Sequence, residues 1–472
     1  MMEGPELTVD NMKDNSVPEN WTNQIKDNDF YLKRQAETES NARSYPRRLP
    51  FALKKASGSW IEDVEGNKYL DALCGAGTMA LGHNHPEIIQ TLKELFDSEF
   101  PLHTLDITTP VKDHFVEYLF KKLPVEMGGD VKIQFCGPSG SDAVDAAIKL
   151  CKIATRNETV ISFHGAYHGM GHGALALTGN LGPKEFVNGL MPGVQFFPYP
   201  HTYRCPFGIG GEAGVNAACH YFERVLKDPE SGIRKPAAVI LEAVQGEGGV
   251  IPAPYKWLKT VRRVTEELGI PLILDEIQAG IGRTGKFFAF EHAEIVPDVI
   301  LLSKAIGGSL PLSVVIYKKK LDLWQPGSHA GTFRGNQMAM AAGLKTLEII
   351  ERDGLLAEVT KKGDYLRKRL EILKKQVSII GDIRGIGLMT GVEYIDPSKG
   401  KDHLGAGVAS GEIASEIQNL CFKNKLIMEK GGRFGAVMRF MPALNIREED
   451  LDCLLTIFEK VTRQVDALYA RK

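Results

Sequence analysis

Short apolar runs alternate with longer amphipathic stretches through the middle of the chain. Between about residues 131 and 317 these runs are VKIQFCG, TVISFHG, AAVILEAV, PLILDEI, DVILLSKA and LSVVIY. Apolar runs separated by helical stretches are typical of a parallel sheet whose two faces are covered by helices. We therefore expect an α/β fold in which the polar residues that end these strands meet at one edge of the sheet.

The segments on either side of this region have different patterns. The chain begins with a polar stretch that leads to a helix near Phe30 to Arg43, and SWIEDVEGNKYLDAL alternates around a turn, which predicts a hairpin. After about Glu348 a charged helix, the strand-like GIGLMTGVEYI, another helix, VMRFMPAL and a closing helix predict an α+β unit. We expect four parts: a polar tail and helix over 1–45, part of a small domain over 46–103, a large domain over 104–347, and the rest of the small domain over 348–472.

The composition excludes several classes of protein. The 472-residue chain is 43% hydrophobic and 25% charged, with a formal net charge of -2, which is ordinary for a globular protein. We therefore expect neither nucleic acid nor a membrane as a partner, and the polar start without an apolar leader predicts a cytoplasmic protein. The seven cysteines are scattered without CxxC spacing, so we expect reduced thiols and no metal site.

A glycine-rich turn follows the first apolar run. In VKIQFCGPSGSDAVDAAIKL this turn separates a strand from an alanine-rich helix that we expect to open with Asp142. Backbone N–H groups and the positive end of the helix dipole then point to one spot, which suits a phosphate, with Gly140 and Ser141 as its contacts. An ordinary strand-to-helix turn with Ser141 as N-cap is the alternative.

The second run ends in aromatic and histidine residues among glycines, TVISFHGAYHGMGHG. Glycines allow a ligand to approach the backbone closely, and the ring of Tyr167 could lie against a planar heterocycle. A flexible loop is the alternative interpretation. His164, His168 and His172 suggest metal ligands, but no carboxylate cluster accompanies them, so we expect no metal here.

Charged residues end two further apolar runs. Asp275 follows PLIL, and a carboxylate at the end of a buried strand requires a cation or a donor, for which a protonated ring nitrogen would serve. Lys304 follows DVILLS and precedes a Gly-Gly turn, where apolar surroundings favour the neutral amine that imine chemistry requires. A turn cap and a solvated lysine are the alternatives. The ordered set of phosphate turn, aromatic loop, aspartate and lysine favours a catalytic site.

Five segments, FHGAYHG, LEAVQGEGG, LILDEIQAGIGRTG, LLSKAIGG and HAGTFRGNQMAMAAG, resemble the class III aminotransferases, which use pyridoxal 5′-phosphate (PLP). The resemblance runs from about Pro50 to the C-terminus. It implies PLP-dependent fold type I, in which a large domain with a mainly parallel seven-stranded sheet between helices accompanies a smaller α+β domain. It also implies a homodimer.

The same resemblance implies roles for individual residues. Lys304 would hold the cofactor as a Schiff base, and Asp275 would contact its pyridine nitrogen, so these two are the expected catalytic residues. Tyr167 would stack on the ring, Gln278 would contact the ring hydroxyl, and Thr332 would reach the phosphate of the neighbouring subunit. The full set of cofactor-binding residues that the resemblance implies is Gly140, Ser141, Tyr167, His168, Glu242, Asp275, Gln278, Lys304 and Thr332.

The resemblance also concerns the substrates. Arg439 in VMRFMPAL matches an arginine that binds the α-carboxylate, and Glu247 in QGEGG matches a glutamate that pairs with this arginine when a distal amine reacts. Either residue could instead be purely structural. Met170 is a departure, because ornithine and GABA enzymes have an arginine there for the distal carboxylate of 2-oxoglutarate. The segment YHGMGHGALALTGNLGPK resembles the subgroup that uses diaminobutyrate and 2-oxoglutarate. We therefore expect diaminobutyrate as the amino-acid donor and 2-oxoglutarate as the 2-oxo-acid acceptor.

Three alternatives stay open at this point. Ornithine, lysine, GABA or β-alanine could be the donor, because residue spacing does not define the size of a pocket. An amino-acid racemase or epimerase could use the same fold and the same lysine and aspartate. A non-catalytic PLP-binding regulator is the third, although the chain has no basic excess that would suit nucleic acid.

Overall fold

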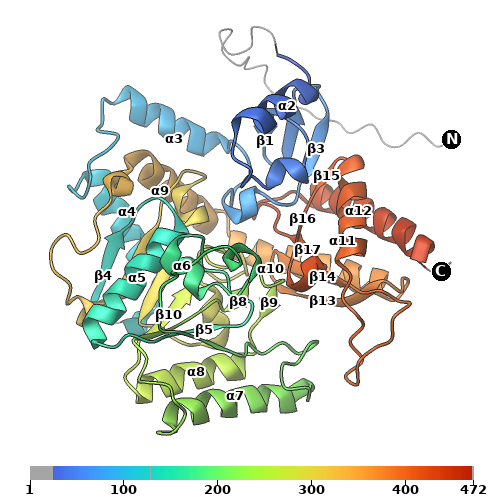
Figure 1. The fold of residues 1–472 in the computed structure, drawn as a ribbon. Coiled ribbons are helices and arrows are strands. Elements are labelled where there is room, and N and C mark those ends of the chain that lie inside the picture. Colours follow the sequence, from blue (N-terminus) through green and yellow to red (C-terminus); the bar gives the residue numbers. More distant parts are fainter. Residues whose placement is uncertain (1–24, 128, 470–472) are drawn as a thin grey trace.

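The computed structural model describes residues 25–127 and 129–469, and a seven-stranded sheet forms its centre (Figure 1). The strand order is β4-β12-β11-β10-β7-β5-β6. β12 is antiparallel to its two neighbours and the other pairs are parallel, so the predicted mainly parallel sheet is confirmed. Its strands are β4 (Val131–Phe135), β5 (Val160–Phe163), β6 (Val194–Phe197), β7 (Ala238–Leu241), β10 (Leu272–Asp275), β11 (Val299–Leu302) and β12 (Val314–Lys318).

Helices cover both faces of this sheet, which explains why its central strands are apolar throughout. In β11, Val299 and Leu301 belong to the core beneath α5, while Ile300 and Leu302 belong to the core on the other face, which α8 and α9 share. The helices of this region are α3 (Pro86–Asp97), α4 (Pro110–Phe120), α5 (Gly140–Thr155), α6 (His172–Leu177), α7 (Gly211–Lys227), α8 (Tyr255–Glu267) and α9 (Gln337–Arg352).

One strand of the sheet, β6, is absent from the predicted runs. It is four residues long, lies at the edge beside β5, and has only Phe197 fully buried. An edge strand is covered less completely than a central one, so VQFF lacks the continuous apolar character that marks its neighbours in the sequence. This strand therefore carries a weaker signal than the other six.

A four-stranded sheet joins the beginning of the described chain to its C-terminal part. β15 (Leu426–Ile427) pairs in parallel with β3 (Lys68–Asp71), which forms the predicted hairpin with β2 (Trp60–Asp63), and β1 (Leu53–Ser57) lies outside β2. The helix expected near Phe30 is α2 (Asn28–Thr38), which Asp27 caps. Residues 1–24 of the predicted polar tail lie outside the part of the chain that the structure describes.

A third sheet and three helices form the C-terminal part. The sheet has the order β13-β14-β17-β16, and GIGLMTGVEYI, expected as one strand, spans the turn of the β13–β14 hairpin. Gly387 allows this turn because its φ is 57° and an added Cβ would lie 2.6 Å from the backbone of Thr284. The elements are α10 (Leu355–Lys374), β13 (Ile380–Ile386), β14 (Met389–Tyr394), α11 (Gly411–Lys423), β16 (Glu429–Gly431), β17 (Val437–Phe440) and α12 (Glu448–Tyr469).

The division of the chain into four parts stays a prediction, although the β3–β15 pairing places residues from two of them in one sheet. Among the described residues, no helix combines the length and the apolar character needed to cross a membrane.

Candidate active site

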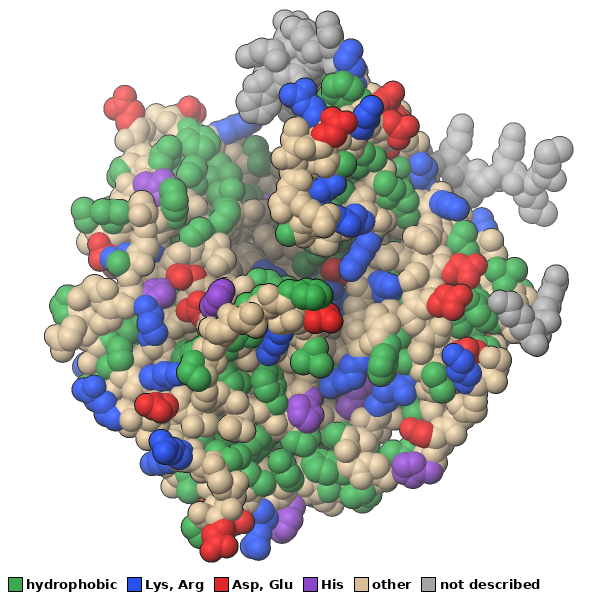
Figure 2. Space-filling view, in the orientation of Figure 1, with side chains coloured by type: hydrophobic (Ala, Val, Ile, Leu, Met, Phe, Trp, Pro, Cys, Tyr) green, Lys and Arg blue, Asp and Glu red, His purple; other side chains and the backbone are tan. Residues whose placement is uncertain are grey.

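The carboxyl ends of the parallel strands border a cavity of about 580 Å³. Asp275 ends β10 and pairs with Leu301 of β11, so Lys304, three residues further along the parallel neighbour, reaches the same edge of the sheet. Figure 2 shows that the face in view is hollowed near its centre. The predicted residues that line the cavity are Gly140, Ser141, Tyr167, His168, Glu242, Glu247, Asp275, Gln278 and Lys304.

Lys304 begins a short 3-10 turn, η6 (Lys304–Gly307), directly after β11, with a φ of 48°. Helix α9 lies against this turn so closely that a Cβ added to Gly343 would be 2.1 Å from the carbonyl oxygen of Ile306. Burial lowers the pKa of the Lys304 amine, whereas the carboxylates of Glu247 and Asp275 act in the opposite direction. The amine is therefore closer to its nucleophilic, neutral form than the amine of a solvated lysine.

The carboxylate of Asp275 contacts the ring of a buried histidine. Its Oδ2 lies 2.7 Å from Nδ1 of His168, whose side chain is fully buried, and its Oδ1 accepts the backbone N–H of Ile277 at 3.1 Å. His168 thus donates to the carboxylate and fixes its orientation toward the cavity. The sequence suggested His168 as a cofactor contact, and the structure adds that it acts on Asp275.

Glu242 connects two loops of the site. Its Oε1 accepts the backbone N–H of Tyr167 at 3.0 Å, and its Oε2 accepts that of Gly246 at 2.9 Å. Burial raises the pKa of Glu242 to about 7, an effect that the charge of Asp275 increases and that of His168 opposes. Glu242 therefore positions both the ring of Tyr167 and the turn that carries Glu247.

The N-terminus of the 16-residue helix α5 points toward the cavity. α5 begins at Gly140 rather than at Asp142, and its N-cap is Ser139, whose Oγ accepts the N–H of Asp142 at 3.3 Å, rather than Ser141. Because Ser139 is the cap, the hydroxyl of Ser141 is available for other contacts, and it accepts the N–H of Gly171 at 2.8 Å. Free backbone N–H groups at the start of such a helix bind anions, so this turn can hold a phosphate.

These residues fit PLP. The cofactor has an aldehyde, a basic ring nitrogen, a planar ring and a phosphate, and the cavity offers a lysine amine, a carboxylate, an aromatic ring and a helix N-terminus in that order. A further indication is that Nε2 of His168 is buried without a hydrogen-bond partner among the described residues, on the side of the ring away from Asp275.

Arg439 lies behind the cavity wall and contacts two carboxylates. The side chain of Arg439 is completely buried; its Nη1 is 2.7 Å from Oε1 of Glu247, and its Nη2 is 2.9 Å from Oε2 of Glu429. Only Glu247 of these three lines the cavity. Glu429 faces Arg439 across the antiparallel β16–β17 pair and is absent from the residues predicted from the sequence. A glutamate directly after the apolar LIM run was the available signal, because such a buried carboxylate needs a cation.

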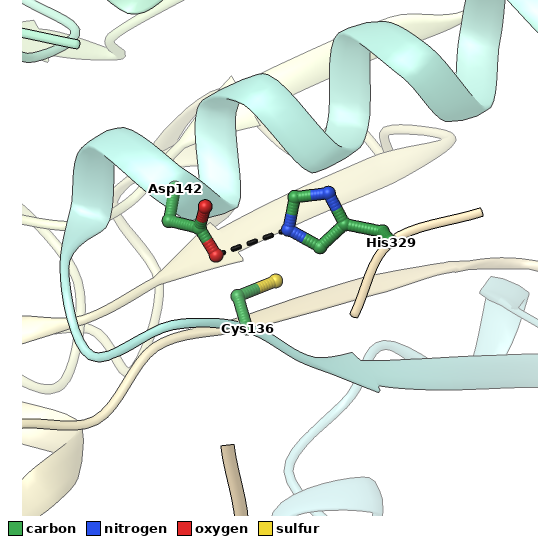
Figure 3. A group of neighbouring side chains, drawn as sticks. All are labelled: Cys136, Asp142 and His329. Carbon is green, nitrogen blue, oxygen red and sulfur yellow. Dashed lines mark hydrogen bonds and ion pairs between the residues drawn. The ribbon is translucent and has the colours of Figure 1, made fainter. Parts of the chain in front are cut away.

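The loop that carries Thr332 lies outside the cavity of its own chain. Thr332 begins η8 (Thr332–Gly335) and is exposed, while His329 of the same loop places Nε2 3.0 Å from Oδ2 of Asp142 in the first turn of α5 (Figure 3). Cys136 completes a group of three potential metal ligands. Asp142 already accepts a second hydrogen bond, from Gly137, and burial keeps the pKa of the Cys136 thiol well above its usual range. We therefore interpret this group as a structural link between the loop and α5.

Comparison with known proteins now identifies the class. Residues 41–462 match the family model of the class III aminotransferases. The chain belongs to this family, and is thus a PLP-dependent enzyme of fold type I. The fold, the enzyme class and the cofactor predicted from the sequence are confirmed.

Two curated relatives have the same name. A diaminobutyrate–2-oxoglutarate aminotransferase from Rhizobium meliloti is 59% identical over 93% of this chain and 94% of its own length, and one from Haemophilus influenzae is 54% identical over 94% and 97%. Among solved structures, the ornithine aminotransferase of Toxoplasma gondii, reported with partial occupancy of PLP at its active site, has a TM-score of 0.78 and 25% identity over 96% of this chain and 98% of its own.

Proposed function

We propose that this aminotransferase moves the terminal amino group of L-2,4-diaminobutanoate to 2-oxoglutarate, which gives aspartate 4-semialdehyde and L-glutamate. The two curated relatives at 54% and 59% identity support these substrates. Met170 lines the cavity where ornithine and GABA enzymes were expected to have an arginine for the distal carboxylate of 2-oxoglutarate, so this carboxylate would be bound by another residue here. A cytoplasmic location stays a prediction.

The pairing of Arg439 with Glu247 is the observation that carries the proposal. With Glu247 in place, the guanidinium is completely buried, so it is not available to an α-carboxylate. A donor that enters this closed state would present its distal amine to the cofactor that Lys304 holds. Movement of Glu247 would expose Arg439 to the α-carboxylate of 2-oxoglutarate, so one residue would serve both halves of the reaction.

The other residues would have defined tasks. PLP, when bound, supplies an aldehyde for the amine and a ring that accepts electrons. Asp275, oriented by His168, would keep a proton on the ring nitrogen, and Gly140 and Ser141 would bind the phosphate. Lys304, once the donor has displaced it, would take the proton from C4 of diaminobutanoate, the carbon that bears the reacting nitrogen.

A panel of donors tests the proposal directly. Purified enzyme is assayed with diaminobutanoate, ornithine, lysine, 4-aminobutanoate and β-alanine, each with 2-oxoglutarate and with pyruvate, and L-glutamate or alanine is measured. The highest kcat/KM is expected for diaminobutanoate with 2-oxoglutarate, and Lys304→Ala should have no turnover. A donor at least about tenfold better than diaminobutanoate, or interconversion of enantiomers without an oxo acid, would overturn it.

We also propose a homodimer in which Thr332 acts on the site of the partner subunit. The support is that Thr332 is exposed, lies outside its own cavity, and sits on a loop fixed to α5 through His329 and Asp142. Mixing Thr332→Ala with Lys304→Ala subunits should restore activity, because each mixed dimer then has one site with both residues intact. Mixed dimers no more active than the Thr332→Ala enzyme would place the threonine in its own site.

A further inference from the structure

The turn that follows β3 has an unusual backbone. The 3-10 turn η2 (Gly75–Gly77) and its N-cap Cys74 give four consecutive residues with positive φ, at 46°, 59°, 57° and 90°. Cys74 and Ala76 carry a Cβ, so this left-handed conformation costs free energy at both positions. Such backbone strain persists only where surrounding contacts hold it, and it is concentrated at functional sites. The turn therefore requires contacts that keep it in place.

Asp71, the last residue of β3, supplies these contacts. Its Oδ1 accepts the backbone N–H of Leu73 at 2.8 Å and that of Cys74 at 3.0 Å. The side chain of Asp71 is only 6% exposed, so water does not compete strongly for the carboxylate. Charge-assisted hydrogen bonds from backbone N–H groups are among the stronger ones in proteins. One carboxylate oxygen thus fixes the chain where it enters the left-handed turn.

His83 contacts the other oxygen of the same carboxylate. Its Nε2 lies 2.8 Å from Oδ2 of Asp71, and its side chain is 11% exposed. The backbone of His83 is fixed as well, because His83 and Gly58 exchange two N–H···O bonds of 2.8 Å. The imidazole is therefore a well-positioned donor that orients the carboxylate of Asp71 toward the turn.

The turn presents one carbonyl group to a residue of the active site. Nε2 of Gln278 donates to the carbonyl oxygen of Ala76 at 3.2 Å. Gln278 lines the cavity, and its Oε1 lies so close to Gly246 that a Cβ added there would be 1.7 Å away. The amide group of Gln278 is thus held between the turn η2 and the backbone of Gly246.

The amide of Gln278 has a second hydrogen that is not needed for Ala76. A side-chain amide nitrogen carries two hydrogens, and only one of them can reach the carbonyl oxygen. The other is directed to the cavity, because a hydrogen bond from Gln278 adds to the charge of Arg439 in lowering the pKa of Glu247 against the effect of burial. A cofactor hydroxyl in this part of the cavity would accept the same hydrogen.

We propose that His83 is a positioning residue for the cofactor, which acts through Asp71 and the turn η2 to hold the amide of Gln278 at the ring hydroxyl of PLP. His83 does not line the cavity itself, so its effect must pass through these contacts. The inference rests on the predicted contact between Gln278 and the ring hydroxyl. It does not depend on which amino donor the enzyme uses.

A double-mutant cycle on PLP binding tests the inference. The dissociation constant of PLP is measured by equilibrium dialysis for the wild type, His83→Leu, Gln278→Leu and the double variant. Loss of one hydrogen bond should weaken binding about 3- to 10-fold in each single variant. Because His83 acts through Gln278, the double variant should bind PLP no more weakly than Gln278→Leu does. Losses that multiply would show that His83 acts by another route, and would overturn the inference.

An analogue of the cofactor isolates the ring hydroxyl. 3-Deoxypyridoxal 5′-phosphate keeps the aldehyde, the ring nitrogen and the phosphate but lacks this hydroxyl. His83→Leu should therefore bind the analogue as tightly as the wild type does, although it binds PLP more weakly. Equal losses for PLP and for the analogue would show a general loosening of the site instead of a positioning role.

Three variants separate positioning from damage to the fold. His83→Gln keeps a donor near the place of Nε2 and should retain the wild-type affinity for PLP. His83→Asn is too short to reach Asp71 and should bind PLP as His83→Leu does, so it decides the question if the leucine variant does not fold. His220→Leu changes an exposed histidine on α7 and should leave both affinities unchanged.

The same measurements distinguish the possible failures. Unchanged PLP binding by Gln278→Leu would refute the contact with the ring hydroxyl, and the inference with it. A loss in Gln278→Leu without a loss in His83→Leu would refute the positioning role alone. No amino donor is present in these experiments, so neither result bears on the proposed substrates, which the panel of donors tests.

Discussion

Replacement of Gly343 by alanine should displace Lys304 through the contact between helix α9 and the η6 turn. The added Cβ would lie 2.1 Å from the carbonyl oxygen of Ile306 and 3.1 Å from Cε2 of Phe115. Ordinary contacts begin at 3.4 Å, so α9 and the η6 turn must separate by roughly 1 Å. Because Ile306 and Lys304 belong to the same short turn, a shift of the Ile306 backbone should also move the amine of Lys304.

The expected effects on stability and on activity differ in size. Overpacking of a core costs about 1 to 3 kcal/mol, but alanine favours a helix over glycine by about 1 kcal/mol, so the net loss should be about 2 kcal/mol or less. A displacement of about 1 Å in a catalytic group can lower the rate about 100-fold. Gly343→Ala should therefore fold and lose most of its activity.

The assay is the single-turnover rate with diaminobutanoate, followed by cofactor absorbance, together with the melting temperature. Gly400→Ala is the matched control, because a Cβ there meets no atom within 4 Å and its φ lies outside the left-handed region. This control should behave as the wild type does. A Gly343→Ala enzyme with a rate within about twofold of the wild type would show that α9 does not hold the lysine turn in place.

Three other outcomes are expected. His168→Gln removes the 2.7 Å contact to Asp275 and should weaken PLP binding about 10- to 100-fold in equilibrium dialysis; unchanged binding would contradict the role of His168. Burial raises the pKa of Glu276 from 4.5 to about 8, so its stabilising effect is full below about pH 4.5 and is lost as the pH rises to about 8. The melting temperature of the wild type should fall over this range more than that of Glu276→Gln, and parallel curves would refute the shift. Asp298 is buried, yet the charge of Arg262 at 2.8 Å lowers its pKa to about 2. The free energy of unfolding in urea at pH 7 should therefore be lower for Asp298→Asn than for the wild type, by about 3 kcal/mol. A decrease below about 1 kcal/mol would contradict the pairing.

The sequence by itself determined the central sheet and the residues at its edge. β10 and β11 are short apolar runs because both of their faces are covered, and this local property is visible without any partner. Asp275 and Lys304 follow those runs directly, and parallel neighbours place the ends of their strands together. Six of the seven strands and the placement of Asp275 and Lys304 at one edge of the sheet were therefore predictable, while the half-covered β6 was not.

Only the tertiary structure decided which charges meet. His168 and Asp275 are 107 positions apart, and Arg439 and Glu247 are 192 apart, so no local pattern relates the members of either pair. Resemblance suggested the Arg439–Glu247 pair, but the contact of Glu429 with the same arginine became apparent only from the register of β16 and β17. The balance of charge around a buried group depends on every side chain that reaches it in space. That balance, one arginine between two glutamates, is the feature that the linear chain does not reveal.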